Sequence, residues 1–79
     1  MSQSSIAVRD ALVEAGIPAT DITPDASLLD DLSIDSTELI EVITLIEKQL
    51  DIHLDEKGFK DIHTVAELIV FVDQSHNVP

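Results

Sequence analysis

The sequence predicts an all-α fold: a four-helix bundle with three main helices, one short third helix and a long loop between helices one and two. Apolar residues recur at the i, i+3, i+4 and i+7 spacing of a helix in three stretches, at residues 6–15, 36–50 and 65–72. Residues that cap helices stand just before each stretch. The one candidate strand, residues 51–54, is too short and too isolated for a stable sheet.

The first predicted helix has Ser4 or Ser5 as its cap and ends at Gly16, after which Pro18 prevents continuation. Its core-facing positions are the apolar residues at helical spacing: Val8, Ala11, Leu12 and Ala15, widened by Ile6 and Val13. Residues 17–34 follow as a long loop rich in turn formers, with one helical turn near residues 25–29. We expect this loop to pack onto the helices through its apolar residues, Ile22, Leu28, Leu29 and Leu32.

The second helix is predicted from Ser36 to Leu50, with Asp35 as its cap. The Asp35 carboxylate suits an otherwise unpaired helix N–H, and Glu38 is placed to reach back to the N–H of Asp35, as in a capping box. Ser36 is then the first helical residue, and its hydroxyl faces solvent at the positive end of the helix dipole. Because free backbone donors and the dipole favour a phosphate group there, a serine so placed suits a phosphodiester.

This helix has two faces. Its buried stripe is aliphatic: Leu39, Val42, Ile43, Ile46 and Leu50. The opposite face is polar apart from one isoleucine: Thr37, Ile40, Glu41, Thr44, Glu47 and Lys48. An exposed Ile40 among acids resembles a small docking surface for a basic partner, whose predicted contacts are Asp30, Asp31, Thr37, Glu38, Ile40, Glu41, Thr44 and Glu47. The alternative is that these acids form only a solvated helix face.

The last third of the chain begins with a connection at residues 51–54 and a brief third helix near residues 55–60, which Gly58 weakens. Thr64 then caps the last helix, and Glu67 completes its capping box. Its core positions are Val65, Leu68, Ile69 and Val72, broadened by Phe71. The chain ends, residues 1–4 and 75–79, are expected to fray.

Composition limits the function classes. The 79 residues suit a single domain, 1–79, which buries about 60% of the unfolded chain's surface. The core is aliphatic, because Phe59 and Phe71 are the only aromatic residues. The chain has no Cys, which excludes disulfides, thiolate metal sites and a cysteine nucleophile.

The charge is strongly acidic, with 16 acids against 4 bases and a net charge of −12. Such a charge repels nucleic acid and anionic membranes and attracts basic protein surfaces, although acidity can also serve solubility alone. No apolar run approaches the ~18 residues of a membrane span, and residues 1–5 lack the features of a signal peptide. We expect a cytoplasmic monomer that binds neither nucleic acid nor membranes.

The residues around Asp35 and Ser36 resemble the phosphopantetheine attachment site of the acyl carrier proteins, in which an Asp-Ser pair follows an Asp-Leu-Gly-x run and opens the second helix. The resemblance continues through residues 41–54 and 62–68 and so covers nearly the whole chain. The chain departs from the family at Ser33, where glycine is usual, and at Thr37, where an apolar residue is usual.

The resemblance implies a carrier and not an enzyme. A phosphopantetheinyl transferase, using coenzyme A and Mg²⁺, would attach 4'-phosphopantetheine to Ser36, with Asp35 contacting the transferase or its Mg²⁺. The arm would supply the thiol that the chain lacks and hold acyl or aminoacyl groups as thioesters. The third helix would open and close the space that receives the cargo. Further partners would be acyltransferases, ketosynthases or adenylating enzymes with basic docking patches.

Three residues favour a specialised pathway. Thr37 and Thr44 replace positions that are commonly apolar in fatty-acid carriers, and Lys48 interrupts the acidic face. We therefore favour a stand-alone carrier of polyketide or aminoacyl-starter assembly over the housekeeping fatty-acid carrier.

Other functions compete with this interpretation. An unmodified acidic helical adaptor would use Ile40 and its acidic surroundings to bind a basic protein. A calcium site at Asp30, Asp31 and Asp35 fails on spacing, because the Asp-x-Asp-x-Asp-Gly loop with Glu at its twelfth position is missing, and we expect no metal. A hydrolase using Ser36 is less favoured still, because His53, His63 and His76 lie outside any nucleophile motif.

Overall fold

The computed structural model describes residues 3–76, and of Glu56, Lys57, Lys60 and His76 only the backbone. It contains three α-helices, α1 (Gln3–Glu14), α2 (Ser36–Leu50) and α3 (Val65–His76), and two 3-10 helices, η1 (Ala19–Asp21) and η2 (Glu56–Asp61). Residues 3–76 form no strand, and their β-structure is limited to one isolated bridge between Ser27 and Thr64. The predicted all-helical class is therefore confirmed for this range.

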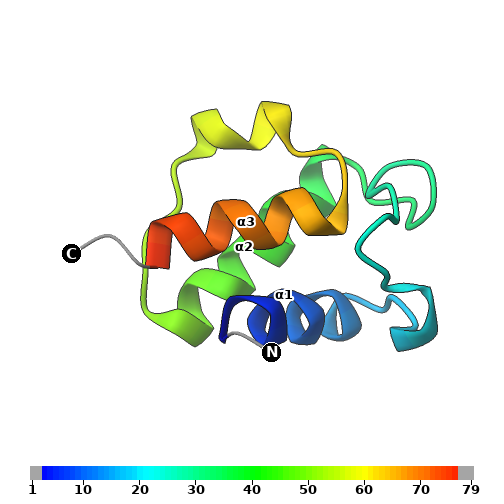
Figure 1. Cartoon of the computed structure of the whole chain (residues 1–79), viewed down its shortest axis with the longest axis horizontal. Helices are drawn as coiled ribbons and strands as arrows, with labels where there is room; N and C mark the ends of the chain where they lie inside the picture. The colour runs from blue at the N-terminus through cyan, green and yellow to red at the C-terminus, as the bar shows by residue number, and fades with distance from the viewer. Residues whose placement is uncertain (1–2, 77–79) are drawn as a thin grey trace.

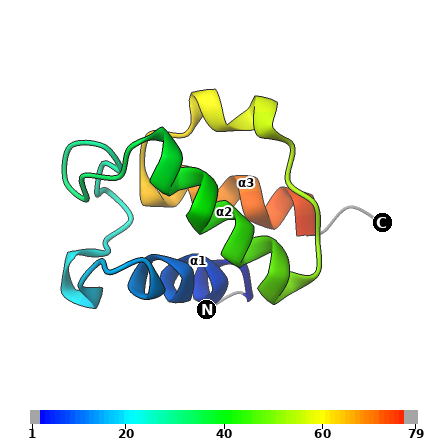
Figure 2. The same cartoon turned by 180° about the vertical axis from the view of Figure 1, so that it is seen from behind.

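The three α-helices form one packed unit. α1 contacts both α2 and α3, and η2 lies on the side of α2 and α3 that faces away from α1 (Figures 1 and 2). Both views place the start of α2 beside the segment that joins η2 to α3. The core between the helices is aliphatic, and its most deeply buried large side chains come from all three: Leu12, Ile46, Leu68, Val8, Val42 and Val72.

The short third helix takes a different form from the one predicted. Residues 56–61 make the 3-10 helix η2, so the structure has three α-helices and not four. Gly58 is needed there because a Cβ at this position would clash with the ring of Phe71. Phe59 packs edge-on against the same ring, with the centroids 5.7 Å apart. η2 is thus fixed to α3 by aromatic contact.

The structure of α1 corrects two predictions, the cap of the helix and the width of its buried stripe. The helix begins at Gln3, so neither Ser4 nor Ser5 caps it; Ser4 is fully buried and its Oγ donates to Asp73 Oδ1 of α3 at 3.0 Å. The buried stripe consists of Ala7, Val8, Ala11 and Leu12, which leaves three predicted core residues exposed: Ile6, Val13 and Ala15. They lie at the edges of a stripe that is narrower than the sequence indicated.

Gly16 ends α1 as predicted. It has φ of 102°, a conformation that glycine adopts without strain. Its N–H donates to the carbonyl of Val13 and the N–H of Ile17 donates to that of Leu12, both at 3.0 Å, which is the Schellman arrangement.

The segment between α1 and α2 differs from expectation in two places. Its helical turn is η1 at Ala19–Asp21, and residues 25–29 form turns. Leu28 and Leu32 are buried, but Leu29, which was predicted to pack inward, is 67% exposed. The adjacent acids and the turn at residues 28–31 keep Leu29 at the surface.

α3 has the predicted core residues. Val65, Leu68 and Val72 are buried, and Ile69 is half-buried. Of the chain ends expected to fray, residues 1–2 and 77–79 lie outside the described range, whereas residues 3–4 and 75–76 are helical. None of the helices in residues 3–76 is long and apolar enough to cross a bilayer.

Candidate functional site

Asp35 starts α2 as the sequence predicts. Its backbone is extended, with φ of −86° and ψ of −177°, and its Oδ1 accepts the N–H of Glu38 at 2.8 Å. The reciprocal hydrogen bond of a capping box, from the N–H of Asp35 to the Glu38 carboxylate, does not form in the described part of the chain. Ser36 is the first helical residue and is exposed.

The loop before Ser36 is held by two features. Ile34 is buried, and its N–H donates to the carbonyl of Leu28 at 2.8 Å. Ser33 adopts φ of 56°, the left-handed region that glycine enters most easily. This conformation gives a physical reason for a glycine preference at this position, and here serine adopts it instead.

A cavity of about 480 Å³ opens beside Ser36. It is bounded by the start of α2, the turn before it, η2 and the connection to α3. Its lining is apolar in one part and polar in another: Leu28, Leu29, Ile34, Leu39, Phe59 and Ile62, with Ser27, Asp30, Asp35, Ser36 and His63. An amphipathic ligand fits such a lining better than a purely apolar one.

The wall that carries His63 is fixed by the capping box of α3. Glu67 Oε1 accepts the N–H groups of His63 and Thr64, each at 3.0 Å, and the N–H of Glu67 donates to Thr64 Oγ1 at 3.2 Å. The hydrogen bond from the backbone of His63 is the largest cause of a lowered pKa at Glu67, which overcomes the opposing effect of desolvation. Glu67 therefore holds this box as a carboxylate.

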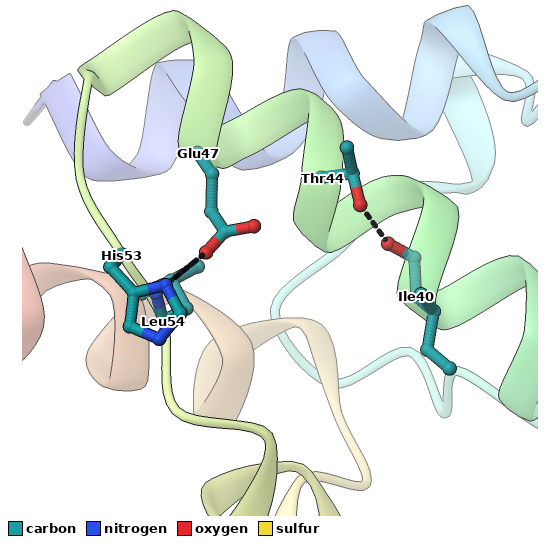
Figure 3. A network of polar contacts seen from close by, with 5 residues as sticks. All are labelled: Ile40, Thr44, Glu47, His53 and Leu54. Carbon is teal, nitrogen blue, oxygen red and sulfur yellow. Dashed lines mark hydrogen bonds and ion pairs between the residues drawn. The ribbon is translucent and has the colours of Figure 1, made fainter.

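The exposed face of α2 contains most of the predicted partner contacts. Thr37, Glu41 and Thr44 are exposed, and Ile40 is 51% exposed. Thr44 Oγ1 donates to the carbonyl of Ile40 at 2.9 Å, so its hydroxyl is turned to its own helix (Figure 3). This face therefore offers the side chain of Ile40 and the carboxylate of Glu41.

The other residues predicted to bind a partner either form hydrogen bonds within this chain or are partly buried. Asp30 and Asp31 are exposed, but Asp31 Oδ2 accepts the N–H of Ser27 at 2.7 Å and so also braces the turn. Glu38 is half-buried.

Glu47 is engaged more strongly than the sequence indicated. It is half-buried, and its Oε2 accepts the N–H of Leu54 at 2.8 Å and lies 3.4 Å from His53 Nδ1 (Figure 3). Its carboxylate fixes the chain that leaves α2, which leaves it less available for an intermolecular contact than a carboxylate without such bonds.

Sequence reasoning named only Asp30, Asp35 and Ser36 of the cavity lining as site residues and missed the others, among them Leu29, Phe59 and His63. Leu29 had a signal, because it adjoins two acids in a turn. Phe59 and His63 had none, since only the tertiary fold brings η2 and its exit to Ser36. Among the side chains that the structure describes, no hydrogen bond joins Ser36 to His63 and no three acidic or histidine residues form a metal site.

Comparison with known proteins identifies the family. The model of the phosphopantetheine attachment site matches residues 7–72. The chain is 30% identical over 79 residues to an acyl carrier protein of Thermobifida fusca, covering 94% of this chain and 100% of that relative. It is 31% identical over 58 residues to an acyl carrier protein of Acidothermus cellulolyticus, covering 73% of this chain and 69% of the relative. The chain therefore belongs to the acyl carrier protein family, as a carrier with a 4'-phosphopantetheine group and not a catalytic enzyme.

Proposed function

We propose that Ser36 carries the 4'-phosphopantetheine arm and that the domain presents acyl or aminoacyl thioesters to biosynthetic enzymes. The observation that carries this proposal is the exposed hydroxyl of Ser36 at the first position of α2, inside the region that matches the family model. Among the described residues, the N–H groups of Ser36 and Thr37 have no acceptor. They are available to the phosphate of the arm.

The arm supplies the thiol on which cargo is held, because the chain has no Cys. The protein's own residues do the positioning. Asp35 fixes the first turn of α2 by accepting the N–H of Glu38, and we assign to its second carboxylate oxygen the contact with the transferase or its Mg²⁺. The cavity beside Ser36 lies where the arm and its cargo would first meet the protein. The 3-10 helix η2, which corresponds to the predicted short third helix, would adjust the width of this cavity.

Carriers of this family interact with a phosphopantetheinyl transferase and with biosynthetic enzymes. Here the docking face comprises Leu29 and Ile40 as apolar contacts, with Asp30 and Glu41 beside them. Acids around a small apolar contact favour partners with basic patches, because charge complementarity raises the association rate while the apolar contact gives affinity. Acyltransferases, ketosynthases and adenylating enzymes with such patches are the proposed partners, and the cytoplasm is the proposed location.

The pathway we favour is polyketide or aminoacyl-starter assembly. Thr37, Thr44 and Lys48 are exposed on α2, so partners meet a more polar face than the apolar positions of fatty-acid carriers would give. Steady-state kinetics with a fatty-acid ketosynthase test this: we expect a lower kcat/KM than for the housekeeping carrier, and equal values would refute the assignment.

Intact-mass measurement tests the attachment. After incubation with coenzyme A and a broad-specificity phosphopantetheinyl transferase, the wild-type protein should gain one phosphopantetheine, and Ser36→Ala should gain none. Ser33→Ala is the matched control, because Ser33 is an exposed serine in the loop directly before Ser36. A wild-type chain that stays at its polypeptide mass would instead support the alternative, an unmodified acidic adaptor.

A further inference from the structure

We propose that His63 positions the arm: its imidazole hydrogen-bonds the polar part of 4'-phosphopantetheine and holds the arm in the cavity beside Ser36. This inference rests on the proposed attachment at Ser36 and adds a residue from a distant part of the chain to that site.

The first support is location. His63 and Ser36 line the same cavity of about 480 Å³, His63 from the connection between η2 and α3 and Ser36 from the start of α2. An arm that leaves the Ser36 hydroxyl and turns toward the cavity passes the His63 wall. No other part of the described chain contributes a histidine to this lining.

The second support is charge. Among the lining residues that the structure describes, Asp30 and Asp35 are acids and none is a lysine or an arginine. A phosphodiester on Ser36 would add a further negative charge beside these carboxylates, which is unfavourable at short range. Of the described lining, the imidazole of His63 is the side chain that can both donate a hydrogen bond to the phosphate or an amide carbonyl of the arm and gain a positive charge when protonated.

The third support is rigidity. The N–H of His63 donates to Glu67 Oε1 at 3.0 Å, and its carbonyl accepts the N–H of Leu28 at 2.9 Å. The main chain of His63 is therefore fixed on both sides, while its side chain is exposed. The Glu67 carboxylate, which accepts the N–H of His63, is a further anion near this residue, besides Asp30 and Asp35, which line the same cavity.

The arm also matches the lining chemically. Pantetheine alternates methyl and methylene groups with a hydroxyl and amides, and the cavity combines apolar side chains such as Ile34 and Phe59 with the polar group of His63. Apolar contact would retain the arm, and a hydrogen bond from His63 would set its direction. Replacement of the His63 side chain should leave the fold intact, because the hydrogen bonds of this residue that support the fold come from its backbone.

Nuclear magnetic resonance of the full chain tests this proposal. The labelled protein is modified with coenzyme A and a transferase, and intact mass confirms the modification. We expect the ring signals of His63 to shift on modification and to show nuclear Overhauser effects to arm protons. His53 is the internal control, because its side chain is 91% exposed beside Glu47 and does not line the cavity.

Variants separate positioning from structure. His63→Ala should lose the contacts between the arm and the cavity, His63→Gln should retain part of them through its amide donor, and His53→Ala should retain all. A mass gain with unchanged His63 ring signals, or with arm contacts that persist in His63→Ala, overturns this inference and leaves the attachment at Ser36 in place. Absence of any mass gain overturns both.

Discussion

The helices α2 and α3 both begin after a capping residue whose side chain accepts the N–H of the residue three positions later. They differ in whether their first two backbone N–H groups have acceptors. At α3 the N–H of Val65 donates to the carbonyl of Ala26 at 3.1 Å and that of Ala66 to the carbonyl of Pro24 at 3.0 Å. At α2 the two equivalent groups, on Ser36 and Thr37, have no acceptor in the described part of the chain.

The difference separates a helix start whose first N–H groups are paired by the fold from one whose first N–H groups have no acceptor among the described residues. The first turn of any helix leaves N–H groups without an intrahelical partner. The fold satisfies those of α3 with loop carbonyls, which ties residues 24–28 to the helix. It leaves those of α2 exposed, at the end where the dipole favours an anion. The two starts should therefore respond differently to substitution.

Proline at the second helical position gives the largest expected contrast. Ala66→Pro removes the hydrogen bond to Pro24, whereas Thr37→Pro removes an N–H that has no acceptor in the described structure. Both variants place the same restriction on the preceding residue, so the difference isolates the hydrogen bond. Urea unfolding should show Ala66→Pro to be less stable than Thr37→Pro by about 1 kcal/mol. Equal losses would show that the two helix starts are equivalent.

Substitutions of Asp35 distinguish capping from transferase contact. Asp35→Ala should lower the free energy of unfolding by about 1 kcal/mol, because the N–H of Glu38 loses its acceptor. Asp35→Asn keeps a good cap but removes the charge, so stability should stay near that of the wild type while the rate of phosphopantetheine transfer falls. A normal rate of phosphopantetheine transfer in Asp35→Asn would show that Asp35 caps the helix and does not contact the transferase through its charge.

The capping box of α3 should make stability depend on pH. The pKa of Glu67 is lowered in the folded protein from its ordinary value of 4.5, chiefly by the hydrogen bond from the His63 backbone. The carboxylate therefore stabilises the fold above pH 4.5, and this contribution is lost as the pH falls through the lower folded value. Thermal unfolding should show Glu67→Gln to be less stable than wild type at pH 7, with the gap narrowing below pH 4.5. A gap that widens in acid would contradict this account.

The smallest effect on stability is expected at Ile40. This residue is 51% exposed on α2, and Val70 is a matched control at 54% on α3. Either alanine variant should change the free energy of unfolding by less than about 0.5 kcal/mol. Only Ile40→Ala should weaken binding to the transferase, as measured by surface plasmon resonance. If Val70→Ala weakened transferase binding equally, the proposal that the docking face lies on α2 would be contradicted.

Sequence reasoning succeeded where local chemistry decides the structure. The Asp35 cap, the Thr64 and Glu67 box and the Gly16 terminus depend on residues within one helical turn, and each has the predicted hydrogen bonds or backbone angle. The range of α2, Ser36–Leu50, was predicted for the same reason, because a cap and a regular apolar stripe mark it.

It failed where distant segments decide. Ser4 looks like a cap, but its hydroxyl is paired with Asp73 from the other end of the chain. Ile6 and Ala7 are both apolar. Ala7 is buried and Ile6 stays exposed because of the side from which α2 and α3 pack against α1, which the sequence does not show. The cavity could not be predicted either, because Phe59 and His63 reach Ser36 through the packing of η2.

The isolated bridge between Ser27 and Thr64 joins the turn before α2 to the start of α3. We expect this bridge and the backbone bonds of Leu28, Val65 and Ala66 to open together, so that the hydrogen exchange of these three amides proceeds at a common rate. Opening of the first turn of α3 would then also loosen the turn before α2, and the two ends of this contact would share one local stability.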